Sequence, residues 1–566
     1  MTGAEGRISR FAREFFSKNG LWALCLLLIL PAIFWSVLDQ KVWAWDDAEY
    51  ARQSLEAFME LQRSLGDWFE RCTAMMRHKA PGLPVIAQVA VPFGIITERY
   101  NASFLILQVL IQLATFGLVV VTYAGRKFVR FDWVTASAVM VLASGPMFLA
   151  MGQQFLVEPL QGLCVMWFVL LMTRARTWQK SRLLLHLFAL IPLSLYVKIS
   201  TPLYVLAPAL IILWALVRRP PPAGDRRGGP KWETYGLLVC GAGVGFMCVA
   251  WYAENLGTII QFMKSNSAGA GEMAIYGRHS GLDEKLPLWI GYFFSGAAPT
   301  KVALVVGILV VLMGGCFGDR RERQKSSSGE WIMPLACGLN VFLVMISFSL
   351  QYNEASRYLY AVYPLCLPVL AWVLKKTGEY SAKGVFVVAL AGWVHLQGGM
   401  FGLWPIPGSA GGFVRPLDFQ GQHLSEVRTL VQAVATGPES RGRVVILAAS
   451  VWWFNPSTLN YYALQNAAAR ENEVLFLTYK FGDLSQKMLM TRLAIRQPLY
   501  VVWCGPEHLD REPALLNKNA LMFQELIRRD PQFEKITLPG TSEVTIYKNR
   551  MPYDAQKQID RLIKRP

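Results

Sequence analysis

Long apolar runs recur along this chain from residue 21 to about residue 403, and after that point they stop. A helix needs roughly twenty mostly apolar residues to cross the hydrocarbon core of a bilayer, and most of these runs approach that length. Only 17% of the 566 residues are charged, whereas about a quarter are charged in an ordinary soluble domain. The sequence therefore predicts an α-helical polytopic membrane protein with a soluble C-terminal part.

The first apolar run, residues 21–38, follows the three arginines Arg7, Arg10 and Arg13. A cleavable signal peptide also begins with a basic stretch, but no cleavage site of the A-x-A type follows this run. The run is long enough to remain in the membrane as an anchor. We therefore expect residues 21–38 to form the first transmembrane helix.

Short loops between the apolar runs carry much of the basic charge. They lie at residues 125–130, 173–182, 218–231, 319–325 and 375–383. Short loops rich in Lys and Arg stay on the cytoplasmic side of a membrane. Topology therefore explains most of the formal net charge of +17, and nucleic acid is not an expected partner.

With these loops inside, the chain crosses the membrane about eleven times, from an inner N-terminus to an outer C-terminus. The apolar piece 82–96 is too short to cross and contains Pro84 and Pro92. We expect it to be an interfacial or re-entrant helix within a first external loop, residues 39–103. The expected spans are 21–38, 104–124, 133–151, 157–173, 183–198, 201–217, 234–253, 297–316, 331–350, 357–374 and 384–403.

The expected transmembrane module covers residues 1–410, and a soluble α/β domain is expected over residues 420–550, outside the membrane. A basic tail, residues 551–566, follows it. Short β-rich runs alternate with helical ones in the soluble domain, which predicts a mostly parallel sheet. The β-rich runs are 443–449, 474–479, 499–504, 533–538 and 544–548, with helices expected at 485–495 and 513–529. No G-x-G-x-x-G or P-loop motif occurs in this domain, which we interpret as a structural or substrate-shaping cap.

The expected external loops collect the residues that are capable of chemistry. The stretch WAWDDAEYARQ follows the first span, and its Trp and Tyr side chains would hold its acids at the level of the lipid headgroups. Glu158 borders apolar spans, where a carboxylate is costly unless it has a partner or a role. Lys198 and Arg357 are candidates too, although both could simply extend their charge to the interface from helix ends. Arg278 and His279, in an expected external loop 252–286, could equally be ordinary loop residues.

Carboxylates together with cations at a lipid interface suit one type of chemistry. The cations can bind the phosphate of a lipid-linked donor, and a carboxylate can take the proton of an incoming hydroxyl group. Departure of the lipid phosphate then transfers the sugar. An enzyme of this kind must reach a very apolar donor from within the bilayer.

Several short motifs resemble those of the GT-C type glycosyltransferases that use polyprenyl-phosphate sugars. The bacterial lipid A aminoarabinose transferases and the protein O-mannosyltransferases are the families most similar in layout. Asp46-Asp47, followed by Tyr50, resembles their acidic pair after the first span. His78-Lys79-Ala80-Pro81-Gly82 resembles a Lys-Pro-Pro-like segment, and Pro92-Phe93-Gly94 resembles the end of an interfacial helix. Glu158 falls where the family has an acid between spans 3 and 4. Lys198 resembles the lysine of a Leu-Thr-Lys-Gly turn, and Arg357-Tyr358-Leu359 resembles an Arg-Tyr-Leu-like helix start.

The resemblance covers about residues 1–400, and it implies both an activity and a site. The activity is transfer of a sugar from a polyprenyl-phosphate donor to a hydroxyl group of a glycan, lipid or protein acceptor, outside a bacterial inner membrane. Asp46 is the implied catalytic base. The other implied residues are Asp47 and Glu158 as catalytic groups, Lys79, Lys198 and Arg357 for the donor phosphate, and Tyr50, His78, Arg278, His279 and Tyr358 for substrate.

The sequence departs from the family pattern at three places. Glu49 stands where the aminoarabinose enzymes have Arg, Ala80 replaces a proline, and Ile199 replaces the glycine after the motif lysine. These changes bear on how the phosphate is bound and on which sugar is used. Family members differ in their need for a divalent metal. The nine Cys and six His of this chain include no C-x-x-C or H-E-x-x-H pattern, so the metal requirement stays open.

Two other interpretations stay open at the level of the sequence. A transporter or flippase of lipid-linked sugars would carry ionisable groups near the middle of the bilayer, whereas His186 and His395 are among the few such groups here. An oligosaccharyltransferase or ligase would move a whole glycan. The modest external loops argue against a form of that enzyme that threads a peptide.

Overall fold

The computed structural model describes most of the chain, and the protein divides into two compact units. The described residues are 2–124, 131–218, 231–268, 280–317, 331–408, 410–421, 423–436, 444–478, 498–504, 517, 520–537 and 544–550. One unit, which we call the helical unit, comprises Met1–Leu38 and Ala57–Leu417. The other, which we call the C-terminal unit, comprises Asp39–Glu56 and Asp418–Pro566. Each unit is described below by itself.

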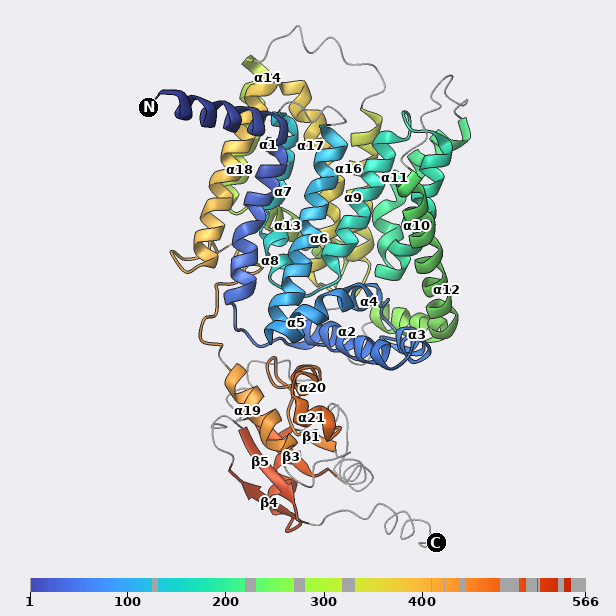
Figure 1. Ribbon diagram of the computed structural model, residues 1–566, viewed down its shortest axis with the longest axis vertical. Coiled ribbons are helices and arrows are strands. Elements are labelled where there is room, and N and C mark those ends of the chain that lie inside the picture. The colour runs from blue at the N-terminus through green and yellow to red at the C-terminus, as the bar shows by residue number, and fades with distance from the viewer. Residues whose placement is uncertain are drawn as a thin grey trace. The chain divides into compact units, whose positions relative to one another are not determined.

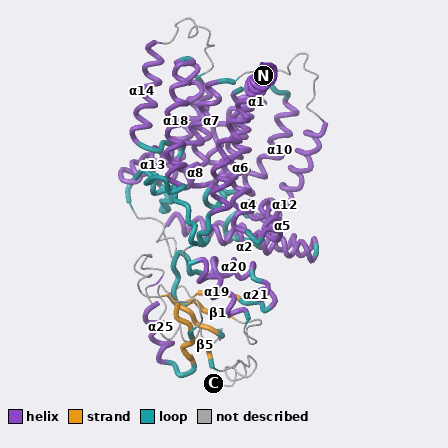
Figure 2. Tube along the Cα trace, turned by 60° about the vertical axis from the view of Figure 1, so that its left-hand side comes forward, coloured by secondary structure: helices purple, strands orange, loops and turns teal. Residues whose placement is uncertain are grey.

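Long helices of the helical unit run side by side as a bundle (Figures 1 and 2). Every span expected from the sequence falls on one or two of these helices. They are α1 (Thr2–Leu38), α6 (Tyr100–Tyr123), α7 (Trp133–Ser144), α8 (Pro146–Gly152), α9 (Glu158–Arg174), α10 (Lys180–Val197), α11 (Thr201–Arg218), α12 (Lys231–Ala268), α13 (Leu282–Ala297), α14 (Lys301–Phe317), α16 (Ile332–Ser349), α17 (Tyr363–Thr377) and α18 (Glu379–Met400).

The predicted polytopic helical membrane fold is confirmed. Among the described residues, seven helices are long and apolar enough to cross a membrane, or up to nine if each bent pair counts as one span. The two other expected spans lie on α9 and α18, which do not meet the same criteria of length and hydropathy. The number of crossings therefore depends on these two helices.

The expected span 133–151 is broken into two helices, and a second bend joins the helix of the expected span 297–316 to a preceding helix that was not expected to be a span. Helices α7 and α8 meet at an angle of 66°, and α13 and α14 meet at 79°. The first break has a clear cause, because α7 ends at Ser144 and Pro146 opens α8 after Gly145. Proline has no backbone N–H to donate to the preceding turn, and its ring clashes with that turn.

The expected long external loop 252–286 is helical at both of its described ends. Helix α12 continues to Ala268 and α13 begins at Leu282, while Arg278 and His279 lie outside the described residues. The second half of α12 packs against helix α3 (Leu65–Ala74). The Trp251 indole donates to the Met75 carbonyl at 3.1 Å, and the Asn255 amide donates to the Thr73 carbonyl at 2.8 Å.

The apolar piece 82–96 forms three short helical segments. They are α4 (Gly82–Ala87), the 3-10 helix η1 (Gln88–Ala90) and α5 (Val91–Thr97). Three of its large apolar side chains, Val89, Phe93 and Ile96, are more than half exposed. The piece belongs to the apolar helices that are too short to cross, which agrees with the expected interfacial or re-entrant role.

The C-terminal unit holds a five-stranded sheet in the order β2-β1-β3-β5-β4. All five strands lie where the sequence predicts them. Their bounds are β1 (Val444–Leu447), β2 (Leu475–Thr478), β3 (Tyr500–Cys504), β4 (Phe533–Ile536) and β5 (Val544–Asn549). The described helices of this domain are α19 (Leu424–Ala435), α20 (Pro456–Gln465), α21 (Ala467–Glu471) and α25 (Ala520–Arg529). The expected helix 485–495 and the tail 551–566 lie outside the described residues.

The sheet is mixed, and the expectation of a mostly parallel sheet is wrong for half of it. Strand β1 pairs in parallel with β2 and β3, whereas β5 pairs antiparallel with β3 and with β4. The connection between Ile536 and Val544 is much shorter than the dozen or more residues of a parallel crossover. A short connection forces β4 and β5 to run in opposite directions.

Candidate functional site

The carboxylate of Glu158 is the centre of a buried ionic cluster. Glu158 opens α9 and is only 2% exposed. The Lys198 ammonium lies 2.9 Å from its Oε1, and the Arg357 Nε lies 3.6 Å from the same oxygen. A carboxylate is also favoured in the first turn of a helix, because the helix dipole is positive there. One buried acid thus holds two cations, and the three groups together have a net positive formal charge.

The turn that carries Lys198 is fixed by hydrogen bonds from two helices. Helix α10 ends at Val197, Lys198 is extended, and α11 begins at Thr201. The Thr201 hydroxyl donates to the Lys198 carbonyl at 2.7 Å. The Gln161 amide of α9 donates to the Ser200 hydroxyl at 3.3 Å. Gln161 lies one helical turn after Glu158, so α9 positions both the carboxylate and the turn that carries its partner.

Arg357 and Tyr358 lie on the 3-10 helix η3 (Ser356–Val362) that precedes α17. The Tyr204 hydroxyl donates to the Tyr358 carbonyl at 2.7 Å, and the Asn353 amide donates to the Tyr358 hydroxyl at 3.2 Å. The Lys198 ammonium lies 4.4 Å from the centre of the Tyr358 ring, within the range of a cation–π interaction. The structure therefore brings together Glu158, Lys198, Arg357 and Tyr358, four of the residues that the sequence singled out.

Lys285, at the start of α13, supports the same region and is missed by the sequence reasoning. It is 3% exposed and donates to the carbonyls of Gln351 and Tyr352, the second at 3.4 Å. Its ammonium also lies 4.0 Å from the Glu354 carboxylate. The segment that leads to Arg357 is thus tied to α13. A lysine directly before the apolar run LPLWIGYFF was the available signal, because ionisable residues beside membrane spans usually have a role.

The His78–Gly82 motif lies beside the end of α10 that carries Lys198. A Cβ atom on Gly82 would lie 2.6 Å from the Tyr196 carbonyl oxygen, so only glycine permits this close approach. His78 is exposed, and its ring lies 4.8 Å from that of Phe262. The Lys79 amide donates to the Met76 carbonyl at 2.7 Å, which shapes the turn before the motif.

The acidic pair lies on helix α2 (Trp45–Arg63), within the segment Asp39–Glu56 that groups with the C-terminal unit. Asp46 and Asp47 occupy the first turn of α2 and are half-buried, and Tyr50 is 5% exposed. One turn later, Glu49 and Glu56 flank Arg52, each with an oxygen 2.7 Å from its guanidinium. Glu49, which departs from the family pattern, is therefore paired within its own helix.

Metal ligands are not clustered in the part of the chain that the structure describes. No group of three or more His, Cys, Asp or Glu side chains there is placed to hold a metal ion. Arg278 and His279, expected to contact substrate, lie outside that part.

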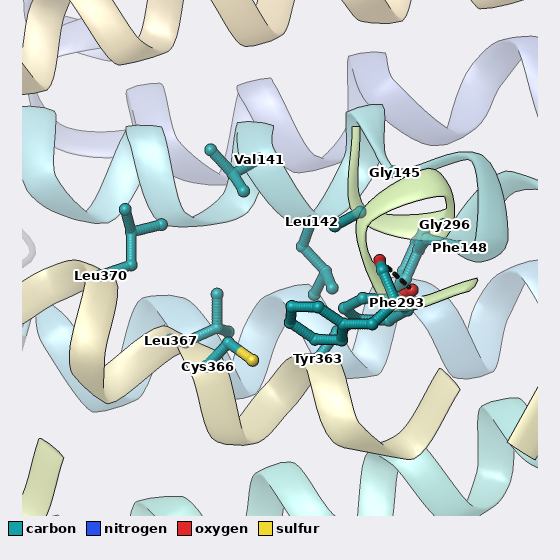
Figure 3. Close-up of a pocket in the computed structure, with 11 residues that line it drawn as sticks. Val141, Leu142, Gly145, Phe148, Phe293, Gly296, Tyr363, Cys366, Leu367 and Leu370 are labelled. Atoms are coloured by element: carbon teal, nitrogen blue, oxygen red, sulfur yellow. Dashed lines mark hydrogen bonds between the residues drawn. The ribbon is translucent and has the colours of Figure 1, made fainter. Parts of the chain in front are cut away.

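Apolar cavities occur within the helical unit. A cavity of about 200 Å³ lies among α7, α8, α13 and α17, where the Tyr363 hydroxyl donates to the Phe293 carbonyl at 3.1 Å (Figure 3). Its lining residue Phe148 stacks on Tyr360, three residues after Arg357, at 5.5 Å between ring centres. A larger cavity of about 590 Å³ shares Val141 and Phe293 with it.

A third apolar space lies closer to Lys198. It has a volume of about 340 Å³ and is lined by α9, α10 and α11, with Ser194, Leu195 and Pro202 at the end near the lysine turn. The Ser194 carbonyl accepts the backbone N–H of Lys198 at 3.1 Å. We call this space the Lys198 groove. The residues on either side of the turn that carries Lys198 therefore line an apolar groove.

Comparisons with known proteins identify the fold. No family model matches the chain, and no curated protein matches it in sequence. Among solved structures, ArnT from Cupriavidus metallidurans in the apo state matches with a TM-score of 0.54 and 12% identity, over 95% of this chain and 98% of that one. The same protein bound to undecaprenyl phosphate matches with a TM-score of 0.54 and 14% identity, over 94% and 98% of the two chains.

A second solved structure shares the architecture. The arabinofuranosyltransferase AftD from Mycobacteria matches with a TM-score of 0.52 and 11% identity, over 95% of this chain but only 40% of that one. The GT-C type fold that the motifs imply is confirmed by these matches. This chain has the ArnT-like polytopic membrane fold, which it also shares with AftD.

Proposed function

We propose that this protein is a glycosyltransferase that moves a sugar from a polyprenyl-phosphate donor to an acceptor hydroxyl group. The observation that carries the proposal is the pairing of Lys198 and Arg357 on the buried carboxylate of Glu158, beside a turn whose flanking residues line an apolar groove. The fold supports it, because ArnT has been solved with undecaprenyl phosphate bound. A phosphate with a long apolar chain needs both of these features in one place.

Lys198 and Arg357 would bind the donor phosphate. Glu158 balances one positive charge where two cations meet, so the three groups together favour an anion. Hydrogen bonds between charged groups contribute about 1.5–3 kcal/mol each, more than neutral ones. Glu158 was singled out as catalytic from the sequence. Its buried position between the cations supports a positioning role, because it fixes where the two donors point.

The transfer step needs a base for the acceptor, and Asp46 would supply it. The acceptor hydroxyl gives its proton to the Asp46 carboxylate while its oxygen forms a bond to the anomeric carbon of the sugar. The bond from that carbon to the phosphate oxygen breaks, and the electron pair leaves with the polyprenyl phosphate. Lys198, Arg357 and Lys79 would stabilise the negative charge that grows on the leaving phosphate. Asp47 would orient Asp46.

The donor chain would lie in the Lys198 groove. The groove is lined by side chains such as Ile191, Leu195 and Val205, and it holds about 340 Å³. Burial of apolar surface contributes about 25 cal/mol per Å², so even part of a polyprenyl chain gains several kcal/mol there. The remainder of the chain would stay in the surrounding lipid.

The site would face the outside of a bacterial inner membrane. Short basic loops stay in the cytoplasm, and the sequence places all of them opposite the first external loop. A reporter fused near Arg227 should therefore read cytoplasmic, and one fused after residue 430 should read external. An external Arg227 would contradict the side assigned to the site.

The activity is tested with purified protein in proteoliposomes that contain radiolabelled sugars on defined polyprenyl phosphates. We expect label to appear in a glycan, lipid or protein acceptor only when donor and acceptor are both present. Label that crosses the vesicle while still attached to its polyprenyl phosphate would instead support a transporter. Transfer of a preassembled oligosaccharide, but not of a single sugar, would support a ligase.

A further inference from the structure

The segment that carries the acidic pair, residues 39–56, packs on residues 418–566, which we call the C-terminal domain. Residues 39–56 group with residues 418–566, although about 360 residues of helical bundle separate them in sequence. Trp43 is 3% exposed, and its ring stacks on that of Tyr461 at 5.7 Å with 11° between the planes. Its backbone N–H donates to the Tyr462 hydroxyl at 3.2 Å. Both tyrosines lie on α20 of the C-terminal domain.

A second set of contacts holds the residues before Trp43. The Gln40 N–H donates to the Asp418 carbonyl at 2.9 Å, and the Asp418 N–H donates to the Asp39 carboxylate at 3.2 Å. The Lys41 ammonium lies 5.4 Å from the centre of the Trp452 ring. Gly421 has a φ of +61°, and a Cβ there would lie 2.8 Å from the Gln40 carbonyl. Backbone, charged and aromatic groups thus all fix the same short segment.

The anchor is close to the proposed base along the chain. Trp43 precedes Asp46 by three residues, which span about 10 Å when fully extended. Trp45, which opens α2, has a φ of +47°, a value that residues other than glycine rarely adopt. The direction of α2 is therefore set at Trp45, immediately after the anchored tryptophan.

We propose that the C-terminal domain is a positioning element for the catalytic base, because Tyr461 and Tyr462 seat Trp43 and so determine where α2 begins and where Asp46 is held. This role rests on the proposed function, in which Asp46 takes the proton of the acceptor. It gives the domain a part in the reaction without a substrate site of its own. Small displacements of a catalytic group are costly, because an error of about 1 Å can lower the rate about 10²-fold.

The positioning role predicts that loss of the anchor lowers kcat for sugar transfer but leaves the Kd for the donor lipid unchanged. Tyr461→Ala and Trp43→Ala in the full-length protein should lower kcat for sugar transfer about 10²-fold, the loss that accompanies a displacement of about 1 Å. Trp43→Phe, which keeps a ring for stacking, should recover most of the rate. The Kd for undecaprenyl phosphate should change less than about twofold in every variant, because Lys198 and Arg357 belong to the helical unit.

Two variants keep the test valid if Trp43→Ala does not fold. Tyr462→Phe removes one oxygen atom and leaves the buried Trp43 N–H without its acceptor, which should lower kcat roughly three- to tenfold. Tyr547→Ala is the matched control. Tyr547 stacks on Trp503 at 4.5 Å within the same sheet, so its loss removes a similar aromatic pair but none of the anchoring interactions of residues 39–43. Its kcat should stay near that of the wild type.

The exchange rate of the Trp43 amide hydrogen measures whether residues 39–43 are anchored, and this measurement needs no substrate. The Trp43 amide should exchange faster in Tyr462→Phe and Tyr461→Ala than in the wild type, and at the wild-type rate in Tyr547→Ala. Faster exchange at Trp43 with an unchanged kcat would overturn the positioning role. A kcat loss in Tyr547→Ala equal to that in Tyr461→Ala would also overturn it, because general damage to the domain would then explain both. A wild-type protein that transfers no sugar would instead refute the proposed function.

Discussion

The Glu158 carboxylate and the Lys198 ammonium lie 2.9 Å apart, although 40 residues separate them in sequence. Glu158 opens α9, and Lys198 follows the end of α10. The acid is almost fully buried, while the lysine and Arg357 retain some exposure. The buried acid therefore fixes the positions of the two more exposed cations.

The pair should be energetically coupled, and a double-mutant cycle measures the coupling. Glu158→Gln deprives Lys198 and Arg357 of this counter-charge and should lower the free energy of unfolding by about 1–3 kcal/mol. Lys198→Met in the same chain removes one of the two cations. The double variant should therefore be less destabilised than the sum of the single variants, by about 0.5–3 kcal/mol. Thermal unfolding in detergent gives these values, and strict additivity would show that the two side chains do not interact.

Lys79 should contribute to use of the donor. Lys79→Ala should weaken donor use by about 1.5–3 kcal/mol if its ammonium bonds to the phosphate. Steady-state kinetics with a varied concentration of polyprenyl-phosphate sugar measures the loss as a change in kcat/KM. Arg77→Ala, which removes an exposed charge two residues earlier, is the control and should leave the donor kinetics unchanged. Equal effects of the two variants would point to the overall charge of the loop rather than to Lys79.

Asp46 should be required for transfer rather than for donor binding. General-base assistance is typically worth about 10²–10⁴-fold, and Asp46→Asn retains the size of the side chain but cannot accept the proton. We expect kcat to fall by about that factor, while undecaprenyl phosphate still binds. Asp47→Asn should cost less if Asp47 only orients its neighbour or a metal.

The first turn of α2 offers a structural alternative for Asp46. A carboxylate there stabilises the helix by about 0.3–1 kcal/mol through the helix dipole. If that were its only role, Asp46→Asn would lower stability slightly and leave turnover near normal. Measurement of both turnover and thermal stability on the same purified variant distinguishes the two roles.

The Lys198 groove should admit the donor chain. Ala209 lies half-buried in its wall, and Ala209→Trp should fill the groove and raise the KM for a long-chain donor about tenfold. A donor with a short prenyl chain should be affected less, since it does not extend as far. Ala303→Trp, in the wall of the larger cavity, is the matched control. A stronger effect of Ala303→Trp would place the chain in that cavity instead.

The sequence predicted the helices and strands well because both depend on local patterns. Apolar runs of near-membrane length became helices at every expected span, and all five β-rich runs became strands. The antiparallel pairing of β5 with β3 and β4 was not predicted, because periodicity does not show how strands pair. For β4 and β5, the short connection between Ile536 and Val544 requires it. The length of α12 was mispredicted as well, because Trp251 and Asn255 gain their partners from α3 and the residues next to it, which hydropathy does not reveal.

The site was predictable where a charge borders an apolar span. Glu158, Lys198 and Arg357 stood out for that reason, and the structure brings them together. Lys285 satisfies the same criterion but was overlooked, since the expected loop 252–286 placed it among ordinary loop residues. Gly82 appeared as part of a motif, and only the backbone of Tyr196 explains why a glycine stands there.

The anchoring of Trp43 on α20 has a consequence for the synthesis of the protein. Its hydrogen-bond partner Tyr462 follows 419 residues later. Ribosomes add about 5–20 residues per second, so Trp43 waits for about 20–80 s, far longer than a local helix needs to form. During that time the first external segment has no docking surface, and the acidic pair on it is not yet held in place. If Asp46 is the base, as proposed, an unfinished chain in the membrane would bind the donor lipid before it could catalyse transfer. Completion of the last domain would then be a checkpoint on activity.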